Sequence, residues 1–236
     1  MSKQSMLTTR QLLICASALL APAIWPPGHA GQLHAQENAA AASAHFSDGW
    51  EDRWENFGLG RKRTVYEVVL DDGGARVLMA RSDGSASALL HRLRLPPAPS
   101  SRISWRWKIQ NTLEGNRRER VKAGDDFVAR LFVIFDGEPF KSESRALCYV
   151  WAASEPVGAV FENPYHAEVV TIVVDSGDGQ AGQWVSRQRD FMKDFRDAFG
   201  RDPEFVSGVA FMVDTDNTHA SARAWFDGMD IELGTS

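Results

Sequence analysis

Cysteine is scarce in this sequence, and so are histidine pairs with the spacing of metal ligands. The 236 residues include 2 Cys and 6 His, and no two histidines form an H-x-H or H-E-x-x-H pair. The sequence therefore does not indicate a transition-metal site. Cys148 lies between Leu147 and Tyr149 in an apolar run. Because a reactive thiol needs a nearby base and a polarised setting, we expect Cys148 to be packed and inert.

An excess of basic residues is also lacking. The chain carries 26 Lys and Arg against 31 Asp and Glu, a formal net charge of −5. Binding to a nucleic-acid backbone needs clustered positive charge, so no nucleic-acid partner is predicted. After residue 30, no apolar run approaches the roughly 20 residues of a membrane-spanning helix, so no membrane span is predicted there either.

The N-terminal end has the pattern of an export signal. Basic residues precede the almost wholly apolar stretch Leu12–Trp25. This stretch is too short for a typical spanning helix but suits the core of a signal peptide, and Gly28 and Ala30 provide the small residues of a cleavage site. The rival interpretation is lipid attachment at Cys15. Lipid attachment requires a small residue just before the cysteine, but the residue at position 14 is isoleucine.

We predict that residues 1–30 are a signal peptide and that the mature protein is periplasmic or secreted. Residues 31–45 offer little bulk to bury, so we expect a mobile tail there. No internal repeat or second linker follows, and residues 46–236 are expected to form a single β-sandwich domain. Loss of the signal peptide leaves one cysteine, which excludes an internal disulfide.

Alternation of apolar and polar residues is the main structural signal. Every second residue from Ile103 to Ile109 is apolar and those between are polar, which is typical of a strand with one buried face. Turn sequences rich in glycine and aspartate separate further segments of this kind. The predicted strands are Arg63–Leu70, Ala75–Arg81, Ser87–Leu95, 102–109, Phe127–Phe135, Arg145–Ala152, Val169–Asp175, Gln183–Arg189, Glu204–Val213 and Ala222–Leu233.

One segment has a different period. Phe191, Phe195 and Phe199 recur every four residues, which predicts a helix over Asp190–Phe199. Gly200 is suited to end it. About ten strands with one short helix predict an all-β fold, an antiparallel β-sandwich of jelly-roll type.

Two strands carry unexpected side chains on the face that should be polar. In a sandwich, one face of each strand packs in the core and the other normally meets solvent. In Phe127–Phe135, the face opposite the expected core carries Arg130. In Arg145–Ala152 we assign the small side chains to the core, at Ala146, Cys148, Val150 and Ala152. The opposite face then carries Arg145, Tyr149 and Trp151.

Arginine and aromatic side chains would then share one accessible face. Such a platform suits a polar ligand such as a sugar, and two guanidinium groups favour a carboxylate or sulfate on it. The alternative is that the helix and loops cover this face, which makes the aromatics a second core and Arg130 part of an internal ion pair. The predicted ligand-binding residues are Arg130, Arg145, Tyr149, Trp151 and Trp184, with Asp126, Asn163, Asp214, Asp216 and Asn217 from neighbouring strands and loops.

Acidic residues invite two other interpretations. A glycosidase needs two carboxylates about 5–9.5 Å apart, and Asp126 with Asp214 or Asp216 would supply them if the fold brought them together. The stretch Asp214–His219 resembles the start of a Ca²⁺ loop, but His219 stands where an EF-hand needs glycine. A turn that hydrogen-bonds its own backbone is the simpler interpretation. We predict no catalytic residue and no metal ligand.

Eight short motifs stand in a characteristic order along the chain. They are Gly84–Ser87, Ser104–Lys108, Gly124–Phe127, Val133–Gly137, Tyr149–Trp151, Asn163–Tyr165, Gly182–Val185 and Asp214–Thr218. Together they resemble the exported bacterial family called domain of unknown function 3047, over about residues 46–233. The resemblance implies export and a single domain, but no reaction and no catalytic residue. The family is similar to galactose-binding-like β-sandwich modules, which often bind glycans and sometimes a structural Ca²⁺.

These patterns predict an exported, non-catalytic β-sandwich that binds a polar small molecule, in particular a saccharide or envelope glycan. One alternative is a carboxylate-dependent glycan hydrolase, which an open cleft flanked by a carboxylate pair would favour. The other alternative is a protein-interaction module of an envelope assembly, which a large exposed apolar patch without a cleft would favour.

Overall fold

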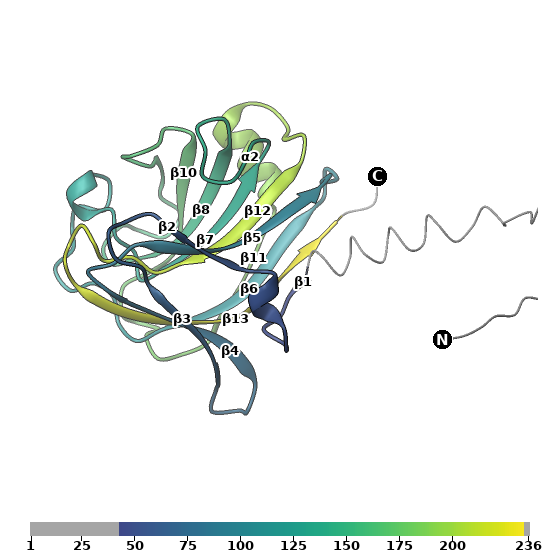
Figure 1. Ribbon diagram of the computed structural model, residues 1–236. Coiled ribbons are helices and arrows are strands. Elements are labelled where there is room, and N and C mark those ends of the chain that lie inside the picture. The colour runs from purple at the N-terminus through teal and green to yellow at the C-terminus, as the bar shows by residue number, and fades with distance from the viewer. Residues whose placement is uncertain (1–42, 234–236) are drawn as a thin grey trace, which may run out of the picture.

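Strands dominate the computed structural model, which describes residues 43–233 (Figure 1). One sheet, here called the β13 sheet, has the order β11 (Val185–Arg189), β6 (Arg102–Ile109), β13 (Ser221–Glu232), β4 (Arg76–Asp83) and β3 (Val65–Leu70), with β1 (Ser43–Ala44) paired to β13. The other, the β12 sheet, has the order β2 (Glu55–Gly58), β5 (Ser87–Leu95), β12 (Val206–Met212), β7 (Ala129–Phe135), β8 (Arg145–Ala152), β10 (Val169–Ser176) and β9 (Val160–Glu162). The helical segments are α2 (Phe191–Phe199) and two 3-10 turns, η1 (Trp50–Asp52) and η2 (Lys122–Gly124).

The sheets pack face to face, and the chain passes repeatedly from one to the other. Strands β3 and β4 lie in the β13 sheet, β5 in the β12 sheet, and β6 in the β13 sheet again. This confirms the predicted all-β sandwich with one short α-helix among the described residues. The β8–β10 pair departs from the antiparallel pattern because its strands run parallel. A parallel pair needs a longer connection than a hairpin, and residues 153–168, which contain β9, provide it.

Large aromatic side chains fill the space between the sheets. Trp105 and Trp107 of β6 are buried there, as predicted. Trp105 stacks on Tyr149 of β8 with ring centroids 5.4 Å apart, and Trp151 lies 6.1 Å from Trp107. Sheets that pack about 10 Å apart need long side chains from both sides to close the gap, and these rings meet that need.

The two faces of β8 are therefore the reverse of our prediction. Trp151 pairs with Ala129 across the β7–β8 ladder, and Tyr149 lies two residues away on the same interior face. The small side chains lie on the outer face, at Ala146, Cys148, Val150 and Ala152. Large rings suit the wide interior, whereas small residues suit the outer face, where covering segments approach closely.

The outer face of the β12 sheet is a second apolar cluster. Phe132 of β7 lies in it, and Phe140, from the segment after β7, packs against it. This face is therefore apolar and packed, as the alternative interpretation expected, but Tyr149 and Trp151 lie in the core between the sheets and not in this second cluster. Cys148 lies in the cluster, and burial raises the pKa of its thiol to about 12. The thiol is therefore packed, as predicted.

Helix α2 covers one end of the interior, at the position predicted. Phe195 is buried against Phe135, with ring centroids 4.6 Å apart. Asp194 accepts a hydrogen bond of 2.8 Å from the Tyr149 hydroxyl and one of 2.6 Å from Arg189. The helix ends at Gly200, whose φ of 70° is the left-handed conformation that glycine adopts without strain.

The predicted signal peptide, residues 1–30, lies outside the described residues, and so does most of the predicted tail, 31–45. The last residues of that tail are not free, because Ser43–Ala44 pairs with β13 and His45 lies 3.5 Å from Asp230. The paired segment therefore begins within the range predicted as a tail. Within residues 43–233, no helix has the length and apolar character to cross a membrane.

Candidate functional site

Acidic residues from two distant segments meet at one end of the β12 sheet. Strands β7 and β12 are antiparallel neighbours, so the residues before β7 lie beside those after β12. Strand β7 begins only at Ala129, so the loop before it delivers two adjacent aspartates to one place. We call the group formed here the aspartate–arginine cluster: Asp125, Asp126, Arg130, Asp214 and Asp216.

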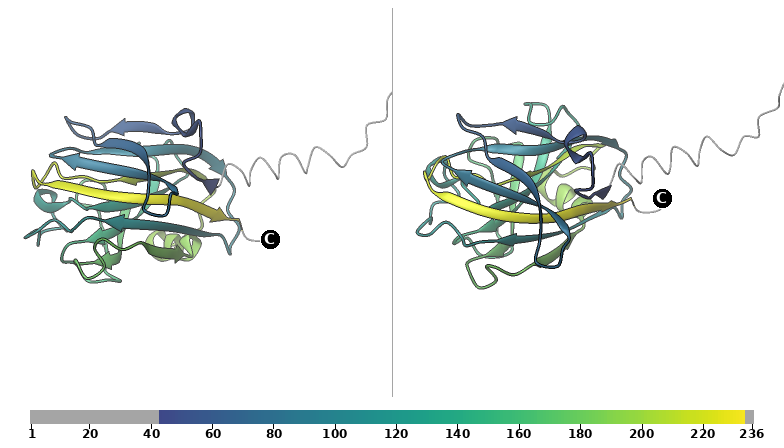
Figure 2. Two further views of the ribbon diagram at one scale, coloured as in Figure 1. Left: turned by 90° about the horizontal axis from the view of Figure 1, so that it is seen from below. Right: turned by 60° about the horizontal axis from the view of Figure 1, so that its bottom comes forward.

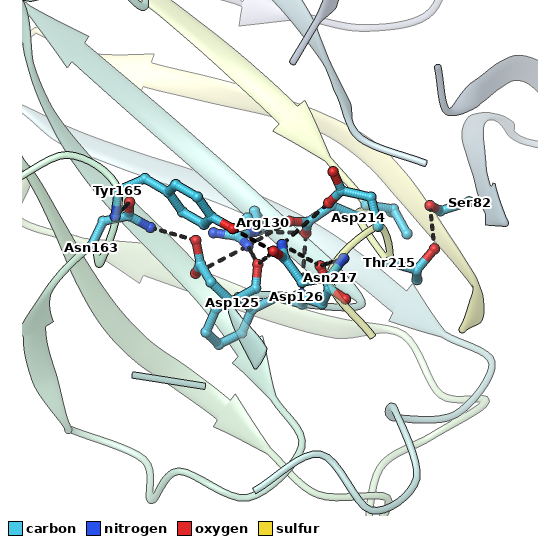
Figure 3. Close-up of polar contacts among 12 residues, drawn as sticks. Ser82, Asp125, Asp126, Arg130, Asn163, Tyr165, Asp214, Thr215 and Asn217 are labelled. Carbon is cyan, nitrogen blue, oxygen red and sulfur yellow. Dashed lines mark hydrogen bonds and ion pairs between the residues drawn. The ribbon is translucent and has the colours of Figure 1, made fainter. Parts of the chain in front are cut away.

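Arg130 forms an internal ion pair in this cluster (Figure 3). Its side chain is only 3% exposed. Its Nε and Nη2 donate to the two carboxylate oxygens of Asp214, at 2.8 and 2.6 Å, and Nη2 also donates to the backbone carbonyl of Asp125 at 2.6 Å. Its guanidinium therefore neutralises buried carboxylates and is not presented to solvent.

Asp126 is held by the loop after β12. Its carboxylate accepts a 2.6 Å hydrogen bond from the backbone amide of Thr218 and a 3.1 Å bond from the Asn217 side chain. Asn163 donates to the Asp125 carboxylate at 2.8 Å, and the Tyr165 hydroxyl donates to the side-chain amide oxygen Oδ1 of Asn217. The cluster is thus a cross-linked network that joins three loops.

The cluster has more acidic groups than its single arginine neutralises. Burial raises the pKa of Asp214 to about 7, and burial followed by the charge of Asp126 raises the pKa of Asp216. Asp126, Asp214 and Asp216 each offer an oxygen within 4.8 Å of the others, a donor set with the chemistry to hold a cation. Acidic proximity by itself assigns no metal, and Arg130 already occupies part of this electrostatic role.

This geometry gives no support to Asp126 and Asp214 as the carboxylate pair of a hydrolase. A glycosidase carboxylate must face a substrate bond, as acid or as base. Asp126 is engaged by a backbone amide, and Asp214 is engaged by Arg130 and the backbone amide of Phe127. These bonds stabilise both carboxylates in structural positions.

The remaining predicted site residues lie elsewhere. Tyr149 and Trp151 are buried between the sheets. Arg145 is at the opposite end of β8 from the cluster, with its Nε 3.2 Å from a carboxylate oxygen of Glu168. We predicted that it would share a site with Arg130, and the structure separates the two. Trp184, which precedes β11, lies at the outer face of the β13 sheet. The structure therefore unites Arg130 with the predicted Asp and Asn residues and separates them from Arg145 and from the three aromatic residues.

Trp184 belongs to a second group, which our sequence analysis missed. The ammonium nitrogen of Lys108 lies 5.1 Å from the ring centroid of Trp184 and 4.8 Å from that of Trp225. All three side chains are partly exposed. Their neighbours Trp107 and Phe226 face the core, so alternation places this group outside. We call Trp184, Lys108 and Trp225 the tryptophan row; the left view of Figure 2 looks onto this sheet, with β13 as the long yellow strand.

The sequence did contain a signal for the tryptophan row. Lys108 belongs to the strand in which we recognised alternation, on its polar side. Trp225 has the same parity as Arg223, two residues before it. A large ring on a polar strand face is a signal of a binding surface, and Trp225 provides that signal in the sequence.

A cleft of about 320 Å³ opens beside the tryptophan row, on the same sheet. Arg223, which lines it, lies on the face of β13 that carries Trp225. The cleft is lined by Arg81, Ser82, Asp83, Gln110, Asn111, Ser221, Ala222 and Arg223. It therefore offers a concave polar surface next to exposed rings.

Comparison with known sequences gives one family. The model of a family described as "Protein of unknown function (DUF3047)" matches residues 49–230, which agrees with the resemblance inferred from the motifs. The sequence finds no match among curated proteins.

Several solved structures are similar in fold. The family 11 carbohydrate-binding module from Clostridium thermocellum, in complex with a β-1,3-1,4-mixed-linked tetrasaccharide, is 12% identical, with 76% of this chain and 88% of that chain covered and a TM-score of 0.43. The xyloglucanase domain of NopAA, a type three effector from Sinorhizobium fredii, in complex with cellobiose, is 11% identical, with 77% and 93% covered and a TM-score of 0.44. The K3 cleaved adhesin domain of Lys-gingipain from Porphyromonas gingivalis is 13% identical, with 80% and 97% covered and a TM-score of 0.42. Such similarities carry no argument about a ligand of this chain.

Proposed function

We propose that this chain, which belongs to the family of proteins of unknown function DUF3047, binds a saccharide on the outer face of its β13 sheet. The observation that carries the proposal is the tryptophan row, in which two partly exposed rings flank a lysine beside a cleft. The proposal moves the predicted ligand platform from the β12 sheet to the opposite side of the sandwich.

The rings of the row suit the apolar face of a sugar. A pyranose presents C–H groups on its faces and hydroxyls at its rim, so it stacks on an indole while neighbouring polar groups reach the hydroxyls. Lys108 has three donors between the two rings. Arg106 adds a guanidinium 5.2 Å from the Trp184 ring, although Asp227 already accepts from it at 2.7 Å. Rings and donors are thus adjacent on one sheet face.

The proposal assigns binding without bond cleavage. Of the carboxylates named for a hydrolase, Asp126 and Asp214 are engaged by backbone amides and by Arg130, and Asp216 accepts from the Asn217 side chain at 3.2 Å. The row itself contains no carboxylate, and Asp227, the nearest along β13, is paired with Arg106.

A glycan array followed by calorimetric titration of the best ligand tests this proposal. We expect Trp225→Ala and Trp184→Ala each to weaken binding roughly tenfold, because each removes one stacking surface. Tyr165→Ala is the matched control, since this ring is 46% exposed but lies at the aspartate–arginine cluster. Absence of any saccharide binding, or a loss confined to the Tyr165 variant, would contradict the proposal.

We also propose that the protein is exported, to the periplasm or beyond the cell. The support is the sequence pattern of residues 1–30, a basic start, a short apolar core at Leu12–Trp25 and small residues at Gly28 and Ala30. The test is the mass of the protein made from the full-length gene in a bacterial host. We expect a mature chain that starts at Gly31 outside the cytoplasm, and an intact chain retained in the cytoplasm would contradict export.

A further inference from the structure

Two arginines lie directly opposite each other in the cleft beside the tryptophan row. Arg81 of β4 and Arg223 of β13 are register partners in an antiparallel pair, so their side chains leave the same face of the sheet. Both line the cleft. Like charges opposite each other are unfavourable unless something between them is negative, so this pair is informative in a chain of net negative charge.

The part of the chain that the structure describes gives this arginine pair no ion-pair partner. Among residues 43–233, neither Arg81 nor Arg223 has a carboxylate within ion-pair distance. Asp83, the acidic residue of the cleft, accepts from Lys62 at 2.7 Å and from Ser221 at 3.0 Å, and it acts on Arg81 only at longer range. The lining of the cleft therefore has two arginines and a single aspartate, which is itself paired with Lys62, so basic side chains are in excess there.

One nitrogen of the Arg223 side chain is also without an acceptor among residues 43–233. Its Nε is shielded from solvent and finds no acceptor among the described residues. Buried donors in folded proteins are nearly always paired, so this orphan nitrogen carries a cost in free energy. The contrast with Arg130, whose Nε donates to Asp214 at 2.8 Å, is direct.

The arginine pair is continuous with the tryptophan row. Arg223 and Trp225 are two residues apart on one face of β13, roughly 7 Å along the strand. Trp225 in turn pairs with Met79, two residues before Arg81. A ring stacked on Trp225 would thus place a substituent over the two guanidinium groups. The side-chain amide of Gln110, on the cleft wall, is placed to meet hydroxyls.

We propose that the saccharide bound at this face carries an anionic group, a uronate carboxylate or a sulfate ester, and that Arg81 and Arg223 bind that group. This inference rests on the saccharide binding proposed above and names its chemical class. The planar, multidentate guanidinium matches the oxygen pairs of either anion, and two of them facing one cleft give a charge complementary to it. The nearby ring supplies the contact with the sugar itself.

Calorimetric titration with two matched ligand pairs tests the inference. One pair is an oligogalacturonide and its methyl-esterified counterpart, and the other is a sulfated galactan oligosaccharide and its desulfated form. We expect at least one acidic member to bind roughly tenfold or more tightly than its neutral counterpart, with an affinity that falls as NaCl is added. The pair that responds distinguishes carboxylate from sulfate.

Variants of the arginine pair complete the design. R81Q/R223Q should remove the preference for the acidic ligand and its salt dependence while leaving the affinity for the neutral member unchanged. Arg102→Gln is the matched control. Arg102 is exposed on the outer face of the same sheet, but it lies at the end of β6 that is far from the cleft. Thermal unfolding of each variant confirms that it is folded.

The outcomes separate the two proposals. Equal affinity for acidic and neutral members, with a loss of both in the Trp225→Ala variant, overturns the inference and leaves saccharide binding intact. Acidic binding that is lost in R81Q/R223Q but is unaffected by both tryptophan variants supports an anion site and overturns the stacking platform. Absence of binding by all four ligands overturns the inference, and the glycan array then decides the broader proposal.

Discussion

The aspartate–arginine cluster and the cleft beside the tryptophan row both contain arginine and aspartate, but they treat charge differently. Arg130 is 3% exposed and forms a two-pronged ion pair with Asp214. Arg81 and Arg223 stand opposite each other without an ion pair among the described residues. The difference teaches that a guanidinium on a sheet face indicates a ligand only when the fold itself leaves the charge unsatisfied.

The largest expected effect comes from removing the internal cation. Arg130→Met removes the cation of a buried ion pair and leaves the Asp214 carboxylate with the backbone amide of Phe127, which typically costs about 3–5 kcal/mol in the free energy of unfolding. The same change at Arg145, a half-exposed residue paired with Glu168, should cost at most about 1 kcal/mol. Urea unfolding of both variants measures the contrast, and equal losses would break the distinction between a structural and a surface arginine.

The contribution of Asp214 to stability should fall as the pH rises from about 4 to about 7. The pKa of Asp214 is raised by burial from 3.8 to about 7, so over this window the folded state holds a proton that the unfolded state has released. Proton release destabilises the folded state by an amount on the order of a few kcal/mol. Below the pKa values of Asp214 in both the unfolded and the folded state, its stabilising contribution is fully present. Urea unfolding at pH 5 and pH 8 measures it, with Asp214→Asn as the reference that should show a flatter pH dependence; an unchanged dependence in that variant argues against the assignment.

The corrected position of Tyr149 predicts an intermediate effect. Tyr149→Phe removes the buried hydroxyl that donates to Asp194 at 2.8 Å and should cost about 1–3 kcal/mol. Tyr165→Phe, at a ring 46% exposed, should change stability by no more than about 0.5 kcal/mol. Neither variant should alter saccharide affinity. A change in affinity without a loss of stability in the Tyr149 variant would restore the platform that we first predicted.

The smallest expected change in stability belongs to the cleft. Replacing both Arg81 and Arg223 by glutamine removes a like-charge pair and no ion pair, so the free energy of unfolding should rise slightly or stay within about 0.5 kcal/mol. Thermal and urea unfolding measure this. A loss above about 1 kcal/mol would show that the two arginines support the fold, as Arg130 does.

The architecture was largely predictable because strand periodicity is a local property. The bounds of β5 and β8 match the predicted Ser87–Leu95 and Arg145–Ala152, and α2 matches the repeat of three phenylalanines. The orientation of β8 was not predictable from alternation, since both faces of this strand are buried. Its orientation follows from the pairing of Trp151 with Ala129, which depends on a different strand.

The candidate site was predictable only in part, for the same reason. Asp126, Asp214 and Asn217 were chosen one by one, and the pairing of β7 with β12 brings them together. Their polar groups are paired through hydrogen bonds between loops, and the alternation of apolar and polar residues in the sequence does not predict such bonds. The link between Trp184 and Trp225 likewise arises from β6, which pairs with both β11 and β13 and places Lys108 between the two rings.

The most direct test of the account is to follow the indole N–H resonances of the protein by NMR while an oligogalacturonide is added. We predict that the signals of Trp184 and Trp225 shift with saturation, while those of the buried Trp107 and Trp151 stay in place. Shifts confined to the buried indoles, or to the backbone amides around Arg130, would contradict a ligand site on the outer face of the β13 sheet.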